Sequence, residues 1–177
     1  MTTWTIDASH TGITFMARHM VVSKVRGSFK TFRGSIEFDE EDLTNSTVDV
    51  TIDAASVDTR DPLRDAYLKS ADFFDVEKFP SLTFQSTRIQ TKGKKDYDVR
   101  GNLTIHGVTR EVVLYARFEG KDNDPWGNQT ASFSATTSVN REDFGLKFSP
   151  VLEAGGVLVS PKIQIELDVQ ATRSNAD

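Results

Sequence analysis

The side chains in this sequence that are best suited to chemistry are its three histidines, His10, His19 and His106. The spacing of His10 and His19 is not that of two metal ligands on one face of a helix. On one continuous strand, positions of opposite parity point to opposite faces, so these two residues could not bind the same ion. We therefore expect no metal site. His19 is in phase with Phe15 and is expected to point inward, either as a hydrogen-bonded interior histidine or as a contact to a ligand.

Motifs of covalent and nucleotide chemistry are absent from the sequence. It has no cysteine, which excludes disulfides, thiol nucleophiles and thiolate metal sites. It has no serine nucleophile elbow, P-loop or glycine-rich dinucleotide motif. Asp58, Asp61 and Asp65 can pair with Arg60 or Arg64, either as helix caps and surface ion pairs or as contacts to a substrate. No catalytic residue and no cofactor are predicted.

Charge and hydropathy exclude further classes of protein. The 177 residues carry a formal net charge of −5, and their lysines and arginines are spread along the chain, which does not favour a nucleic-acid partner. No stretch approaches the ~18 apolar residues of a membrane-spanning helix. The first residues do not resemble a signal peptide, so we expect a cytoplasmic protein, or a periplasmic or secreted one if a signal peptide has been removed. We expect one domain over residues 1–172 and a frayed tail over residues 173–177.

Alternation of apolar and polar residues is the dominant pattern, and it predicts β-strands. It is clear from Ile13 to His19 and changes phase between Phe29 and Phe32, which predicts a bulge near residues 30–31. The later alternating stretches are residues 48–52, 82–84, 97–105, 112–118, 131–139 and 163–169. About eight strands separated by turn residues indicate an all-β sandwich or barrel.

One stretch, residues 62–70, departs from this alternation and is typical of a short helix. Asp61 suits the N-cap and Pro62 the first helical position. Leu63 and Tyr67 would share one face of the helix. Two phenylalanines follow, so we expect a helical lid across one end of the barrel.

The interior of the barrel stays open between two interpretations. Twelve phenylalanines stand against three tyrosines and two tryptophans, and many fall on one strand face. They can fill the barrel completely as a core, or they can line a lumen that holds one elongated apolar ligand. The small residues within the strands favour a cavity slightly, because they leave volume unfilled: Gly27, Gly34, Gly101, Ala17, Ala116, Ala131 and Ala135.

Several ordered motifs make the chain similar to the YceI family of lipocalin-like, polyisoprenoid-binding proteins, from about residue 4 to residue 169. They are WTIDASH at 4–10, VRGSF at 25–29, FRG at 32–34, DTRD at 58–61, RDAYLKSADFFD at 64–75, FPSLTFQS at 79–86, GNLTIHGVT at 101–109, WG at 126–127 and NREDFG at 140–145. Each motif is weak by itself, but this many in order is specific. Family members often carry histidine before the helix leucine, where this chain has Tyr67.

The resemblance implies an extended eight-stranded antiparallel β-barrel, lipocalin-like, with the helical lid around residues 62–70. It implies that a polyisoprenoid, an isoprenoid quinone or a fatty amide is bound in the lumen and sequestered or transported. The expected ligand-binding residues are Ile13, Phe15, Ala17, His19, Phe29, Phe32, Ile36, Phe38, Val48, Val50, Ile52, Arg64, Asp65, Tyr67, Leu68, Phe73, Phe74, Phe84, Val99, Leu103, Ile105, Leu114, Phe133 and Phe144. Arg64, Asp65 and His19 are the candidates for contact with a polar head group.

Two other functions stay open at this point. An enzyme acting on an isoprenoid or lipid would need a polar constellation inside the barrel, such as His19 beside a carboxylate. A ligandless stress-response interaction module would be favoured by a fully packed interior. A homodimer through Met16 and Met20 is compatible with all of these functions.

Overall fold

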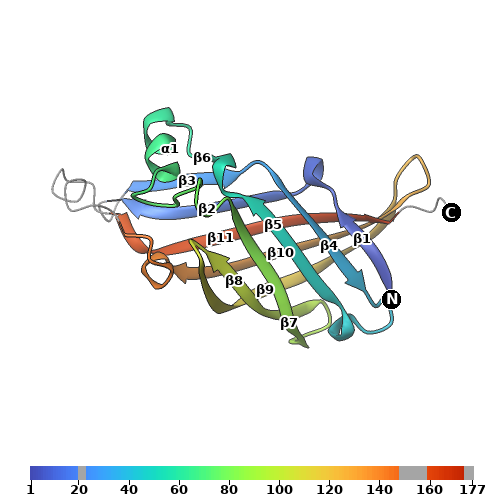
Figure 1. The fold of residues 1–177 in the computed structure, drawn as a ribbon. Helices are drawn as coiled ribbons and strands as arrows, with labels where there is room; N and C mark the ends of the chain where they lie inside the picture. Colours follow the sequence, from blue (N-terminus) through green and yellow to red (C-terminus); the bar gives the residue numbers. More distant parts are fainter. Residues whose placement is uncertain (20–22, 148–158, 174–177) are drawn as a thin grey trace.

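The computed structural model describes residues 1–19, 23–147 and 159–173, and most of these residues lie in antiparallel strands (Figure 1). The strands are β1 (Thr2–Ile6), β2 (Gly12–His19), β3 (Ser23–Phe29), β4 (Phe32–Phe38), β5 (Thr47–Asp53), β6 (Val57–Asp58), β7 (Ser81–Thr91), β8 (Asp96–Ile105), β9 (Val108–Asn123), β10 (Gln129–Asn140) and β11 (Val159–Arg173). Their order is β1-β4-β5-β7-β8-β9-β10-β11-β2-β3-β6. Pairing of β1 with β11 closes this sheet into an eight-stranded antiparallel barrel.

Three pairs of consecutive short strands act as bent versions of single long strands. β1 pairs with the end of β11 at Thr172, whereas β2 pairs with β11 from Val159 to Asp168. A short 3-10 helix, η1 (Ala8–His10), separates β1 from β2, and η3 (Ala54–Ser56) separates β5 from β6. β3 and β4 are separated at residues 30–31, the place where the sequence alternation changes phase. The eight long strands predicted from the sequence are therefore confirmed.

The helical lid is α1 (Pro62–Lys69), which lies over the end of the barrel opposite the N-terminus (Figure 1). Asp61 caps it, because its carboxylate accepts hydrogen bonds from the backbone N–H groups of Leu63 (3.1 Å) and Arg64 (3.2 Å). Pro62 occupies the first turn, as predicted. The buried residue of the helix is Leu68, whereas Leu63 is 85% exposed.

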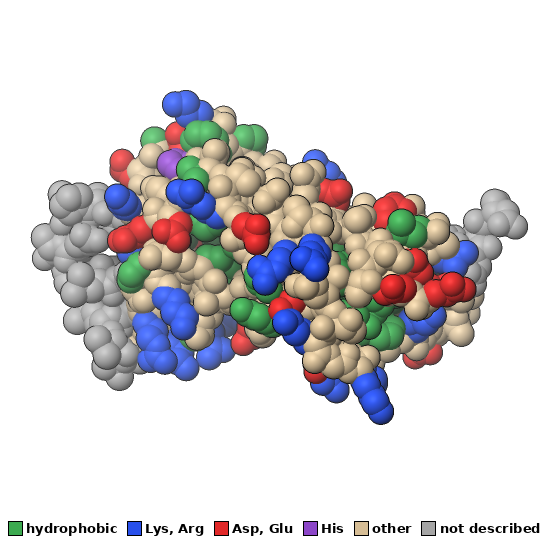
Figure 2. All heavy atoms as spheres, turned by 90° about the horizontal axis from the view of Figure 1, so that it is seen from below, with side chains coloured by type: hydrophobic (Ala, Val, Ile, Leu, Met, Phe, Trp, Pro, Cys, Tyr) green, Lys and Arg blue, Asp and Glu red, His purple; other side chains and the backbone are tan. Residues whose placement is uncertain are grey.

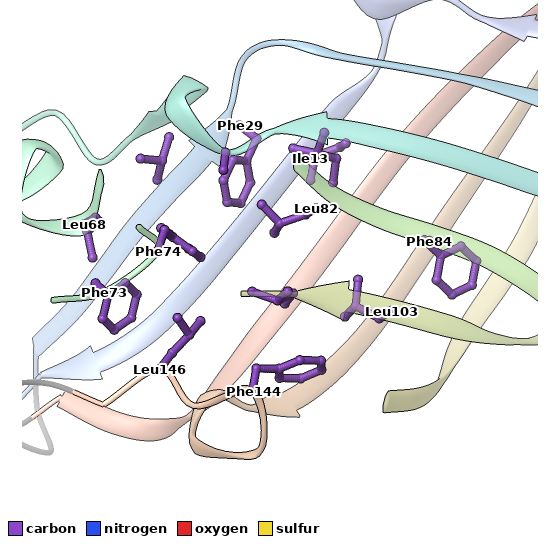
Figure 3. Close-up of a cluster of buried hydrophobic side chains, with 14 of the residues drawn as sticks. Ile13, Phe29, Leu68, Phe73, Phe74, Leu82, Phe84, Leu103, Phe144 and Leu146 are labelled. Carbon is purple, nitrogen blue, oxygen red and sulfur yellow. The ribbon is translucent and has the colours of Figure 1, made fainter. Parts of the chain in front are cut away.

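The barrel interior contains two separate groups of buried apolar side chains. The larger group lies toward α1 and includes Ile13, Phe29, Leu68, Phe73, Phe74, Leu82, Phe84, Leu103, Phe144 and Leu146 (Figure 3). The smaller group lies around β1 and consists of Trp4, Ile36, Phe38, Ala131 and Ala171, with Leu43, Val48, Phe118 and Phe133 packed against it. Within the described residues, different sets of apolar side chains therefore fill the two halves of the barrel.

The outer surface carries charges of both signs. Figure 2 shows Lys and Arg side chains interspersed with Asp and Glu side chains on one face of the molecule. No described helix has both the length and the hydropathy needed to cross a membrane.

Candidate ligand-binding site

An apolar cavity of about 530 Å³ lies inside the barrel below α1. This volume is within the range of small-molecule sites in proteins, roughly 300–1,000 Å³. Apolar residues from the strands, the lid segment and the loop after β10 point into it, as the labelled side chains of Figure 3 illustrate. Leu63 borders the cavity and is 85% exposed, so the cavity opens to solvent beside α1.

Two strand glycines let aromatic rings pack closely against the strand backbone at the cavity wall. A Cβ atom at Gly27 would lie 2.4 Å from Phe15 Cζ, and a Cβ atom at Gly101 would lie 2.5 Å from Phe84 Cζ. Both rings therefore occupy the space that a side chain at the glycine would need. The sequence interpretation that small residues leave volume unfilled is wrong at these two positions. The glycines keep the lumen open in another way, because they let the rings lie over the backbone.

Polar groups at the mouth come mainly from residues 59–67. The Arg64 side chain borders the cavity, and its guanidinium donates hydrogen bonds to Thr59 Oγ1 (2.8 Å) and the Thr59 carbonyl (2.7 Å). Arg64 also lies 3.7 Å from the Asp61 carboxylate, and its side chain is 39% exposed. Tyr67 is half-buried and borders the same cavity. The lining therefore includes a cation, a carboxylate, a hydroxyl and a phenol from this segment, since Asp61 and Thr59 border the cavity as well.

Asp65, a predicted contact to a polar head group, has its hydrogen bonds to Thr59. It is not on the cavity wall; its carboxylate accepts hydrogen bonds from the Thr59 backbone N–H (2.9 Å) and the Thr59 hydroxyl (2.5 Å). Thr59 is 4% exposed and contacts both Arg64 and Asp65. Asp65 therefore positions the segment that carries the mouth residues, and it does not itself face the cavity.

Sequence reasoning missed Arg141, which borders the cavity although it is only 4% exposed. Its guanidinium donates to the carbonyl oxygens of Leu146 (2.7 Å) and Ser160 (3.4 Å). These bonds join the loop after β10 to β11 and hold Phe144 and Leu146 against the interior. The NREDFG motif was the available signal, since Asn140 caps η4 (Arg141–Phe144) and Gly145 ends it at a φ of 73°.

The structure separates the predicted site residues into two sets. Those that border the cavity are Ile13, Phe15, Ala17, Phe29, Ile52, Arg64, Tyr67, Leu68, Phe73, Phe74, Phe84, Leu103, Ile105, Leu114 and Phe144. Those that do not border it are Phe32, Ile36, Phe38, Val48, Val50, Asp65, Val99 and Phe133. His19 is the last residue of β2, and its side chain lies outside the described part of the structure. Strand alternation predicts which residues point inward, but not which of them border empty space, and this explains the strand residues of the second set.

The structure also contains a serine, a histidine and an aspartate in contact, at η1. His10 Nδ1 lies 2.8 Å from Asp7 Oδ2 and 3.1 Å from Ser9 Oγ. In a catalytic triad the histidine contacts the serine with one ring nitrogen and the aspartate with the other. Here Ser9 and Asp7 both contact Nδ1 of His10, so the arrangement is not that of a catalytic triad. Hydrogen bonds from Ser9 and His10 lower the pKa of Asp7, as expected for a capping carboxylate.

Among the described residues, no group of three or more His, Asp or Glu side chains could hold a metal ion.

We predict that Gly27→Ala will narrow the lumen and weaken binding of an apolar ligand several-fold. The new methyl group would lie within 3 Å of the Phe15 ring and of Thr59 Cγ2, so the ring must move away from the wall. The measurement is the affinity for a long-chain isoprenol. Gly12→Ala is the matched control, because a Cβ atom at Gly12 has no neighbour within 4 Å. Equal affinities for both variants would contradict the role assigned to Gly27.

Comparisons with known proteins agree with this architecture. The YceI-like domain model matches residues 4–171. The chain is 36% identical over 165 residues to a UPF0312 protein of Vibrio parahaemolyticus, covering 93% of this chain and 83% of that protein. It is 35% identical over 171 residues to a UPF0312 protein of Staphylococcus aureus, covering 96% of this chain and 97% of the other.

Solved structures show the same fold. The Campylobacter jejuni YceI protein superimposes with a TM-score of 0.77 at 30% identity, covering 89% of this chain and 90% of that one. BcnA of Burkholderia cenocepacia gives a TM-score of 0.82 at 24% identity, covering 93% and 98%. A polyisoprenoid binding domain from Saccharophagus degradans gives 0.74 at 12% identity, covering 97% and 98%. The lidded barrel, the motifs that build it and the family match over residues 4–171 together establish that this chain belongs to the YceI-like family.

Proposed function

We propose that the protein binds one long-chain apolar lipid in the barrel lumen and sequesters or transports it. The observation that carries this proposal is the largely apolar cavity below α1, which opens beside the lid and has a group of polar side chains from residues 59–67 in its lining. A polyisoprenoid, an isoprenoid quinone or a fatty amide has the matching form, with a long apolar chain and a small polar end. The Saccharophagus degradans domain is described as polyisoprenoid binding, but its low identity supports only the fold, so the proposal rests on the cavity.

The hydrophobic effect can supply the affinity without many polar contacts. Each methylene transferred from water into the cavity contributes about 0.8 kcal/mol. About ten buried methylene groups would contribute about 8 kcal/mol, which is comparable with a micromolar Kd. The loss of ligand freedom on binding reduces this value. Specificity for the head group would then depend on the mouth, where Arg64, Thr59 and Tyr67 are the residues we propose as contacts. The predicted contact of His19 stays a prediction.

The test is an organic extract of the protein purified gently from its own host. We expect a long-chain lipid at about one molecule per protein chain, identified by mass spectrometry. As a control, the same extraction is applied to the Ala17→Trp variant discussed below. An extract with no such lipid, combined with no binding of added isoprenols, would reject the proposal.

The homodimer predicted from Met16 and Met20 stays a prediction: Met16 is half-buried, and Met20 lies outside the described residues.

A further inference from the structure

The cavity ends before the barrel does. On β11, Ile163, Ile165 and Leu167 border the cavity, whereas Ala171, further along the same strand, is fully buried in the smaller apolar group. On β10, Thr137 and Val139 border the cavity, and Ala131 is again fully buried in that group. Ala131 and Ala171 are paired across β10 and β11, as are Thr137 and Ile165. The two neighbouring strands therefore pass from the cavity to the packed group at the same depth in the barrel.

Four aromatic rings fill the closed end, and we call them the aromatic floor: Trp4, Phe38, Phe118 and Phe133. The ring centroids of Trp4 and Phe38 are 5.3 Å apart, and those of Phe118 and Phe133 are 5.2 Å apart. Phe38 joins the two pairs, at 6.0 Å from Phe133 and 6.5 Å from Phe118. These separations are those of rings in direct contact. The four rings do not border the cavity itself; along β10, Phe133 lies beyond Thr137, so the floor lies deeper in the barrel than the cavity.

The floor is also closed from beneath. Trp4, Ala131 and Ala171 each have 0% exposure, so the centre of this group is inaccessible to solvent. Leu43, from the 3-10 helix η2 (Leu43–Asn45), packs against the same group. Pairing of β1 with both β4 and β11 closes the wall around it. Within the described residues, the cavity opens beside α1, and the end of the barrel around β1 is packed.

We infer that the aromatic floor sets the maximum length of the apolar chain that the protein accepts. This inference rests on the proposed function, since it assumes that the cavity holds such a chain. Phe133 and Ala135 are the residues best placed to test it. They lie two positions apart on one face of β10, and Thr137, the next residue on that face, borders the cavity. Ala135 is 8% exposed and pairs with Ala116 of β9 and Leu167 of β11.

Two opposite substitutions change the depth of the lumen. Phe133→Ala removes a ring of about the size of one isoprene unit and lowers the floor. Ala135→Phe adds a ring between the cavity and the floor and raises it. The probes are all-trans isoprenols that differ by one isoprene unit, with affinities measured by native mass spectrometry and titration calorimetry. Circular dichroism establishes that each variant is folded.

For the wild-type protein we expect affinity to rise with each added isoprene unit up to a limiting length and then to stop rising. Phe133→Ala should extend this limit by about one unit and strengthen binding of the next longer isoprenol by about 60-fold or more, because at least three additional methylene groups leave water. Ala135→Phe should shorten the limit by about one unit. If Phe133→Ala is too unstable to measure, the shortening by Ala135→Phe is the deciding result.

The outcomes separate this inference from the proposed function. A wild-type protein that binds isoprenols with the same limiting length as both variants would overturn the floor as the length determinant and leave lipid binding intact. A wild-type protein that binds no isoprenol of any length, and yields no lipid on extraction, would overturn the proposed function, and the inference would fall with it.

Discussion

Replacement of Trp4 by alanine is expected to lower the free energy of unfolding by about 3–5 kcal/mol, the usual effect of removing a buried aromatic side chain. Trp4 has 0% exposure and contacts the Phe38 ring, and its indole Nε1–H donates to Thr2 Oγ1 at 2.9 Å. For a protein of this size the melting temperature should fall by about 6–20 °C. Urea unfolding followed by circular dichroism measures the change.

The chain contains its own control for this experiment, because its other tryptophan is exposed. Trp126 lies in the turn between β9 and β10 with 83% exposure. Its contribution to that turn is a backbone N–H that donates to Asp124 Oδ1, a bond that alanine retains. Trp126→Ala should therefore change the free energy of unfolding by no more than about 0.5 kcal/mol. Similar losses for the two variants would mean that Trp4 is not the centre of a packed floor.

The sequence predicts the fold well because strand alternation and capping are local properties. The inward phase of Phe15, the phase change at residues 30–31 and the Asp61–Pro62 helix start each depend on a few adjacent residues. β1 was missed as a strand, although its Trp4 is the most buried large side chain together with Phe144. Its short stretch carries only two buried positions, Trp4 and Ile6, too few for a clear alternation.

The candidate site could be predicted only in part, since a cavity is a property of side chains far apart in the sequence. Phe84 and Phe133 have the same alternation, yet Phe84 borders the cavity and Phe133 belongs to the floor. What separates them is the depth at which each strand crosses the barrel, and this depends on register and tilt. The interior combines a packed half and a half that encloses a cavity, and the alternation of the strands does not distinguish the two.

The second large effect is expected at Ala17, where a tryptophan should obstruct the lumen. Ala17 borders the cavity, is 5% exposed and pairs with Val25 and Ile163, which also border it. The indole would enter space that the ligand needs. If it displaces about three methylene groups, binding weakens by about 2.4 kcal/mol, a factor of about 60. Because the cavity is adjacent, the fold should accommodate the ring at a cost below the ~1–3 kcal/mol typical of overpacked cores.

Met16→Trp is the matched control, one residue earlier on β2. Met16 alternates with Ala17, does not border the cavity and pairs with Arg26 and Gln164. The two variants add the same indole to the same strand on opposite faces, so their difference isolates the lumen from general effects on β2. We expect Met16→Trp to retain the lipid found in the wild-type protein and Ala17→Trp to lose most of it. Retention of lipid by Ala17→Trp would place the ligand outside the barrel, whereas loss from both variants would point to the outer face of β2 as the binding surface.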